Sequence, residues 1–176
     1  GVRMRLFLLH HGLADIEANK PMQKDALFRV WSMSKPVTGV AILMLMEEGK
    51  VRLNDPVSRF LPEFKSLKVA TVTNPQAGAK ETVEFTTDSA KREITIQDLL
   101  THVSGLGSGR VGTQEIQKLS GSNRPGKTLT EYIPLWAKTP LAFQPGSQWL
   151  YSPLAAFDTL GRVVEIASGM PFDRFL

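Results

Sequence analysis

Apolar residues fall into a few short runs along this chain, and the strongest run lies between residues 40 and 46. Every residue from Val40 to Met46 is apolar, so a helix over this run has no polar face and is expected to be buried. Pro36 suits a first helical turn, where its missing N–H has no helical partner in any case, and Gly49 supplies a C-terminal stop. The pattern predicts a helix from about Ser32 to Glu48 that is buried all round.

A second helical stripe lies near the C-terminal end of the chain. Apolar and small residues recur there at helical spacing, after a capping residue, Ser152, and a proline, Pro153, at the first helical position. Gly169 is expected to end this helix. The predicted inner stripe comprises Leu154, Phe157, Leu160, Gly161 and Val164.

The rest of the chain reads as short elements separated by turns. Thr95 is expected to cap a helix over residues 96–100 that ends at Ser104-Gly105. The Gly- and Ser-rich segment 105–126 is expected to be a mobile surface loop. Further expected elements are a β-like run at 5–10, a short helix at 57–61, a hairpin pairing 67–72 with 82–86, a helix at 129–138 and a turn at 143–146.

Composition narrows the class of protein. The 176 residues fit one domain or part of one, and contents of 42% hydrophobic and 22% charged residues are those of a globular protein. The net charge is +4, but the basic residues are scattered, so no nucleic-acid partner is expected. The absence of cysteine excludes disulfides and thiolate metal sites. No cofactor is expected.

Apolar runs also bear on membranes and targeting. None reaches the roughly 18 residues of a membrane span, so no span is expected. The run from Met4 to Leu9 is too short for a signal peptide. The sequence begins with Gly1 rather than Met, so this prediction applies to the given residues alone. The compartment is left open between the cytoplasm and the periplasm of a bacterium.

Candidate chemistry lies at the start of the first predicted helix. Ser32 and Lys35 are three residues apart, so both side chains lie on one helix face. A serine hydroxyl is a weak nucleophile until a neighbouring base takes its proton, and a helix N-terminus offers N–H groups to a developing oxyanion. The alternative interpretation is that Ser32 or Ser34 is an ordinary helix cap.

Further stretches extend this Ser-x-x-Lys pattern in a fixed order. They are the segments 27–36, 46–57, 94–106 (with Leu99-Leu100-Thr101-His102), 143–152 (with Trp149-x-Tyr151-Ser152) and 161–172. Together they resemble the serine β-lactamase-like superfamily, and within it class C β-lactamases and family VIII carboxylesterases. The resemblance runs from about Leu13 to the end of the chain, without clear counterparts for residues 65–93 and 107–127.

The resemblance implies an α/β (α+β) fold of the β-lactamase/transpeptidase type. Residues 1–176 would form a partial domain, with a sheet remnant and lead-in at 1–30 and a mainly helical region at 31–176. The family carries a further Lys-Thr-Gly or His/Trp-x-Gly element on a C-terminal edge strand, and no residues follow Leu176 here. Helices with apolar faces need a cover, so we expect a truncated chain, a second chain that completes the sheet, or a rearranged piece of the fold.

The resemblance also implies a mechanism. Ser32 would attack an ester or amide carbonyl to form an acyl-enzyme, and Lys35 and Tyr151 would share the proton transfers. Lysine has an ordinary pKa of about 10.4, so Lys35 must either have a lowered pKa or act through a tyrosine phenolate. Which of the two groups is the general base stays open. The Ser32 N–H and an N–H from a later strand would stabilise the oxyanion.

One departure from the family pattern bears on the substrate. β-Lactamases have Tyr-x-Asn, whereas this chain has Tyr151-Ser152-Pro153, so the amide that would hold a β-lactam side chain is missing. We therefore expect a carboxylesterase acting on small acyl esters. A β-lactamase or D-alanyl-D-alanine carboxypeptidase is the enzymatic alternative, and a catalytically inactive fragment or binding scaffold is the alternative of another class.

Other conspicuous residues are expected to have no catalytic role. His102 is expected to satisfy loop backbone, and His10 and His11 to be surface residues at a strand edge. Gly107-x-Gly109-x-x-Gly112 matches a dinucleotide-binding pattern, but no strand precedes it. No Gly-x-Ser-x-Gly motif occurs, which argues against an α/β-hydrolase.

Overall fold

The structure, a computed structural model, describes residues 9–78, 81–120 and 128–176. The chain divides into two compact units, residues 1–31 and 32–176. In the first unit, β1 (Leu13–Asp15) and β2 (Lys20–Pro21) form an antiparallel pair. The strand expected at 5–10 lies mostly outside the described residues, and its last two positions are irregular.

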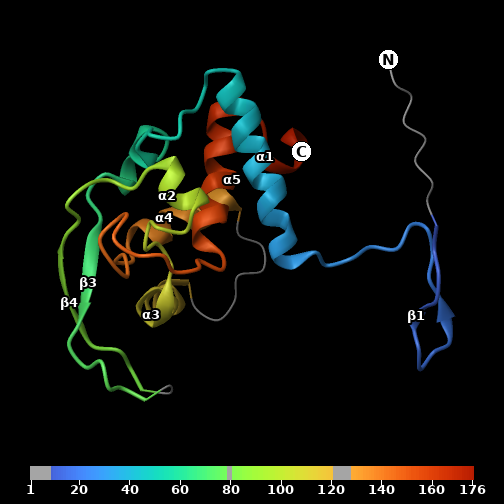
Figure 1. The fold of residues 1–176 in the computed structure, drawn as a ribbon, viewed down its shortest axis with the longest axis horizontal. Helices are drawn as coiled ribbons and strands as arrows, with labels where there is room; N and C mark the ends of the chain where they lie inside the picture. Colours follow the sequence, from blue (N-terminus) through green and yellow to red (C-terminus); the bar gives the residue numbers. More distant parts are fainter. Residues whose placement is uncertain (1–8, 79–80, 121–127) are drawn as a thin grey trace. The chain divides into compact units, whose positions relative to one another are not determined.

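The second unit is built around two helices. After a 3-10 turn, η1 (Trp31–Met33), α1 (Ser34–Glu47) packs against α5 (Ala155–Ser168), and the two lie side by side in Figure 1. The prediction that α1 is buried all round is wrong. One face lies in the core, whereas the other is about half exposed because the described residues supply a cover on one face only. The buried apolar residues are Ala41, Ile42 and Leu45, and the exposed ones are Val37, Val40, Leu43 and Met44.

The start of α5 differs in detail from the prediction. The helix begins at Ala155, after Pro153 rather than at it. The N-cap residue is Leu154, which makes no side-chain capping bond, so the prediction that Ser152 is the cap is wrong. The Ser152 Oγ nevertheless accepts the Ala156 N–H in the first turn at 3.1 Å. Leu154 is 43% exposed and lies outside the buried stripe. Gly169 ends the helix in the left-handed conformation, with φ 74°, as predicted.

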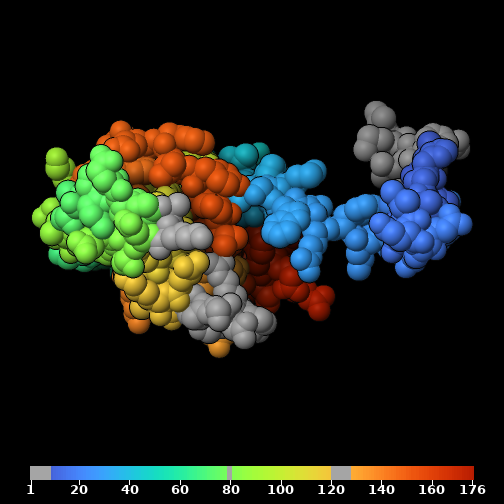
Figure 2. Space-filling view, turned by 90° about the horizontal axis from the view of Figure 1, so that it is seen from below, coloured from blue at the N-terminus to red at the C-terminus, as the bar shows by residue number. Residues whose placement is uncertain are grey.

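The predicted hairpin is present, with its second strand displaced. β3 (Lys68–Val72) pairs antiparallel with β4 (Phe85–Ser89), from Lys68 opposite Ser89 to Val72 opposite Phe85. Asn74 fastens the connection, because its side chain bonds the Thr82 carbonyl and the Glu84 N–H. The side chain of Gln114 bonds both backbone groups of Val83, so the hairpin lies against the helix α3 (Gly109–Ser120) (Figure 2).

Segment 105–126 is not the surface loop that its glycines suggest. Residues 109–120 form α3 (Gly109–Ser120), and 121–126 lie outside the described residues. Gly107 adopts φ 58°, a conformation that favours glycine. A Cβ on Gly112 would lie 2.8 Å from the backbone of Gly107. These two glycines therefore serve a tight turn and a close packing contact, not a dinucleotide.

The remaining described elements complete one core. α2 (Ile96–Leu100) has the predicted Thr95 cap, in a capping box with Asp98, and α4 (Leu129–Ala137) lies where a helix was expected. The helix expected at 57–61 is replaced by two 3-10 turns, η2 (Val57–Arg59) and η3 (Pro62–Phe64), and α6 (Phe172–Phe175) follows α5. In the described ranges, no helix has both the length and the apolar character needed to cross a membrane. The largest fully buried side chains come from most of these elements and include Ile42, Leu45, Phe64, Ile96, Leu99, Leu106, Ile133 and Leu160.

Candidate active site

Ser32 and Lys35 meet at the entry to α1. Ser32 lies in the 3-10 turn, and the Lys35 Nζ donates a hydrogen bond to the Ser32 Oγ at 3.2 Å. The N-cap residue is Met33, and no side chain caps the helix. The alternative interpretation of Ser32 or Ser34 as an ordinary cap is therefore wrong. The Ser32 hydroxyl is exposed and free of a structural capping bond.

Tyr151 reaches the same point from the segment that precedes α5. Its hydroxyl donates to the Ser32 Oγ at 2.7 Å, across 119 positions of sequence. The Lys35 Nζ lies 5.0 Å from the centre of the Tyr151 ring and donates to the Pro153 carbonyl at 2.7 Å. That bond fixes the lysine to the segment that carries the tyrosine. The structure thus brings Ser32, Lys35 and Tyr151 together.

The electrostatics of this trio make the phenol more acidic than a free tyrosine. The neighbouring Lys35 and the hydrogen bond with Ser32 hold the pKa of Tyr151 below its ordinary value. A phenolate can accept the proton of a serine hydroxyl within hydrogen-bond distance. Tyr151 is 38% exposed, so the trio is open to solvent on this surface.

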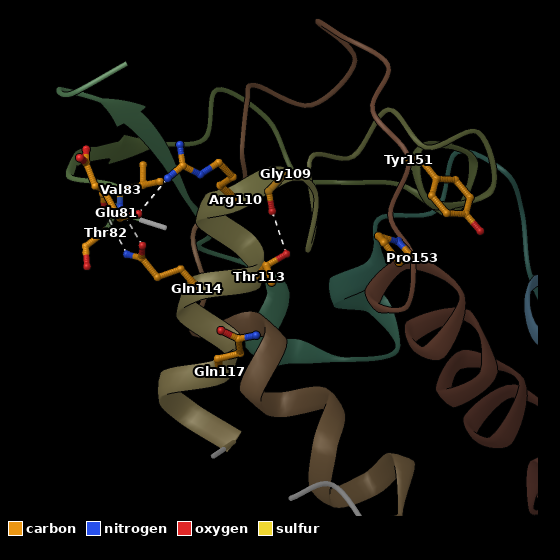
Figure 3. Close-up of a pocket in the computed structure, with 10 residues that line it drawn as sticks. All are labelled: Glu81, Thr82, Val83, Gly109, Arg110, Thr113, Gln114, Gln117, Tyr151 and Pro153. Carbon is orange, nitrogen blue, oxygen red and sulfur yellow. Dashed lines mark hydrogen bonds between the residues drawn. The ribbon is translucent and has the colours of Figure 1, made fainter. Parts of the chain in front are cut away.

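A cavity of about 540 Å³ opens beside Tyr151 (Figure 3). Tyr151 and Pro153 line one side, and α3 and the hairpin line the other. The Arg110 guanidinium donates hydrogen bonds to the carbonyls of Ala77, Gly78 and Glu81. Arg110 therefore ties α3 to the hairpin and also lines the cavity. The cavity is lined by Glu81, Thr82, Val83, Gly109, Arg110, Thr113, Gln114, Gln117, Tyr151 and Pro153. The α3 side of this cavity was missed from the sequence because its segment was interpreted as a loop.

Of the three histidines, His102 lies as the sequence suggested. The Nδ1 of His102 accepts the backbone N–H of Ser152 at 3.2 Å, which confirms that this residue satisfies loop backbone. His10 and His11 are exposed just before β1. Within the described ranges, no group of three or more His, Asp or Glu side chains is placed to hold a metal ion.

Comparisons with known proteins agree with this architecture. The model of the Beta-lactamase family matches residues 4–176. Esterase EstB of Burkholderia gladioli is 38% identical over 171 residues, covering 94% of this chain and 38% of the esterase. The structure of EstCE1, described as a hydrolase with promiscuous acyltransferase activity, matches with a TM-score of 0.69 and 30% identity over 93% of this chain and 39% of that one. A putative D-alanyl-D-alanine carboxypeptidase of Salmonella typhimurium is 28% identical over 79% of this chain and 28% of its own length.

The helical layer with a small antiparallel sheet is thus part of a β-lactamase/transpeptidase-like fold. The chain belongs to the Beta-lactamase family. It spans about 40% of the length of the esterase and of the solved hydrolase that it matches.

Proposed function

We propose that this chain carries the nucleophile of a serine hydrolase that works through an acyl-enzyme, and that its substrates are small acyl esters. The observation that carries the proposal is the contact of one exposed hydroxyl with two groups able to move its proton. The Ser32 Oγ lies 2.7 Å from the Tyr151 hydroxyl and 3.2 Å from the Lys35 Nζ. An ordinary surface serine needs neither contact.

The reaction follows from these positions. With Tyr151 ionised, the Ser32 hydroxyl donates its proton to the phenolate while its Oγ attacks the ester carbonyl carbon. The Lys35 ammonium stabilises the phenolate before the attack. Tyr151 then returns the proton to the departing alcohol as the bond between the carbonyl carbon and the alcohol oxygen breaks. This leaves an acyl group on Ser32. Water attacks this acyl group by the same proton path, and the acid leaves. A positioned general base typically contributes about 10²–10⁴ in rate.

Two features favour an ester over a β-lactam. At the position where β-lactamases carry an asparagine amide, this chain has Pro153, whose carbonyl is occupied by Lys35. Neighbouring Ser152 is fully buried and its hydroxyl oxygen accepts the Ala156 N–H of α5, so it offers no substitute donor. EstB and EstCE1, whose names describe an esterase and a hydrolase, support the same assignment. The carboxypeptidase relative supports the peptidase alternative.

Hydrolysis assays on the full chain test the proposal. We expect turnover of a short-chain p-nitrophenyl ester, little or none of a chromogenic cephalosporin, and no ester turnover by Ser32→Ala. Ser34→Ala is the matched control, because it removes a nearby hydroxyl that lies outside the trio. Cephalosporin turnover that exceeds ester turnover would favour the β-lactamase alternative. Ester turnover that survives in Ser32→Ala, or no turnover of either substrate, would overturn the proposal, and the second result would favour a binding scaffold.

A further inference from the structure

His102 holds the backbone on both sides of Tyr151. Its carbonyl accepts the N–H of Leu150 at 3.2 Å, and its Nδ1 accepts the N–H of Ser152 at 3.2 Å. Its ring lies 4.7 Å from the Tyr151 ring, centre to centre. One residue therefore bonds the two neighbours of the tyrosine and contacts the tyrosine itself.

The backbone of His102 is set for this task. The residue lies two positions after Leu100, the last residue of α2, and has φ 60°, a left-handed conformation that is uncommon for residues other than glycine and in which Asn, Asp and His are enriched. The capping box of Thr95 and Asp98 fixes the start of α2, and Arg92 binds the Asp98 carboxylate. His102 thus follows a helix, α2, whose first turn is held by several bonds.

The ring must be neutral to accept the Ser152 N–H, because a protonated imidazole has two donors and no acceptor. Burial, and then the charge of Lys35, lower the pKa of His102. Its ring also lies 5.5 Å from the Phe157 ring and 6.3 Å from the Trp149 ring. These surroundings suit a neutral imidazole whose Nε2 carries the proton.

We propose that His102 is a positioning residue for the proposed reaction: by accepting the Leu150 and Ser152 N–H groups it holds the Tyr151 hydroxyl against the Ser32 Oγ and beside Lys35. The inference rests on the proposed function for its consequence, but the placement of the phenol can be measured without catalysis. Without the Nδ1 acceptor, the buried Ser152 N–H loses its partner and the tyrosine is free to leave the lysine.

Two variants separate the acceptor from the bulk of the ring. His102→Gly removes the side chain and keeps a backbone that accepts φ 60°. His102→Asn also tolerates this conformation and returns an acceptor, its Oδ1, at about the position of Nδ1. The chain has two tyrosines, so the ultraviolet absorbance of tyrosinate, with Tyr151→Phe as the blank, reports the ionisation of Tyr151.

In wild type we expect Tyr151 to ionise below the ordinary tyrosine pKa. In His102→Gly this ionisation should move up toward the ordinary value, and modification of Ser32 by a fluorophosphonate should slow about 10²-fold, the lower end of a general-base contribution. His102→Asn should restore most of both. An unchanged tyrosinate titration in a folded His102→Gly, or an Asn variant as impaired as the Gly variant, would overturn the proposal.

Nitrogen NMR of wild-type imidazoles gives an answer that does not depend on how the variants fold. We expect the His102 Nδ1 to be unprotonated and hydrogen-bonded near neutral pH, and a protonated Nδ1 would contradict the proposal. If instead fluorophosphonate leaves wild-type Ser32 unmodified while both spectroscopic results hold, the proposed function fails and the positioning role stands.

Discussion

Both faces of α1 consist mainly of apolar residues, but one face is buried and the other is about half exposed. Ile42 and Leu45 are fully buried in the core that α5 shares, whereas Val40 and Leu43, on the other face of the same helix, are 55% and 50% exposed. The exposed face belongs to the helix that begins beside Ser32 and Lys35. The packed face therefore holds the helix in place, and Lys35 lies at the N-terminal end of that packed side, where its Nζ contacts the Pro153 carbonyl and the Phe157 ring of α5.

This difference separates residues that determine stability from residues that determine reactivity. The core that the packed face of α1 joins, called the packed region below, also contains the contact of Gly107 with Gly112 and the buried Asp98 carboxylate. The N-terminal end of α1 carries the trio of Ser32, Lys35 and Tyr151, whose side chains are partly in water. Substitutions in the first should lower the free energy of unfolding, and substitutions in the second should alter chemistry while the fold persists.

Shortening a buried side chain of α1 should have the largest effect on stability. Ile42→Ala is expected to lower the free energy of unfolding by about 2–5 kcal/mol, since it removes buried methylenes and leaves a cavity. Val40→Ala, the matched control on the open face, should change it by no more than about 0.5 kcal/mol. Chemical denaturation measures both values. Equal losses would show that the open face is covered in solution.

A methyl group at the close contact between α3 and the turn before it should cost less than the cavity. Gly112→Ala would place a Cβ 2.8 Å from the Gly107 backbone, and such overpacking typically costs about 1–3 kcal/mol. A Cβ on Gly39 of α1 meets no atom within 4 Å, so Gly39→Ala should instead stabilise the chain by up to about 1 kcal/mol. Thermal unfolding distinguishes the two, and a stabilising Gly112→Ala would refute the tight contact.

Acid should weaken the packed region through Asp98. Burial acts to raise the pKa of this carboxyl, but hydrogen bonds from Arg92 and Thr95 outweigh it and hold the pKa below the unfolded value of 3.8. The resulting stability is present above that value and is lost as the pH falls through the lower folded pKa. Asp98→Asn should remove this part of the acid dependence and, by weakening the capping box, cost about 1 kcal/mol at neutral pH. A wild-type acid profile in the variant would contradict this assignment.

The smallest stability effect is expected at the N-terminal end of α1. Lys35→Met keeps much of the side-chain length but removes the charge, so the free energy of unfolding should change by about 0.5 kcal/mol or less. The ionisation of Tyr151 should nevertheless move to higher pH, because the ammonium that favours the phenolate is gone. Tyrosinate absorbance measures the shift. An unchanged titration would show that the lysine does not act on the phenol.

Sequence patterns correctly predicted the helix ends that are determined by neighbouring residues in the sequence. Thr95 and Asp98 form the capping box at the start of α2, and Gly169 ends α5 in a left-handed conformation. The segment that forms α3 was misinterpreted because Gly109 and Gly112 weaken a helical pattern, although buried Val111 and Ile116 mark its inner face. The need for glycine at position 112 comes from a tertiary contact, which no local pattern contains.

The candidate site shows the same limit. Spacing alone placed Ser32 near Lys35, because three residues make one helical turn. The approach of Tyr151 across 119 positions was expected only from the family resemblance. The sequence predicted that His102 satisfies loop backbone, but it did not indicate that the backbone groups are those of the two neighbours of Tyr151. The exposure of one face of α1 could not be predicted either, because apolar residues indicate that a face can be covered and not which segment covers it.

The central claim is that one hydroxyl is made reactive by a phenol and an amine, and covalent modification tests it most directly. Wild-type chain treated with a fluorophosphonate and digested for peptide mass mapping should carry one adduct, on Ser32. Tyr151→Phe and Lys35→Met, both folded, should react at least about 10²-fold more slowly. An adduct on another residue, or wild-type reactivity in Tyr151→Phe, would contradict the account.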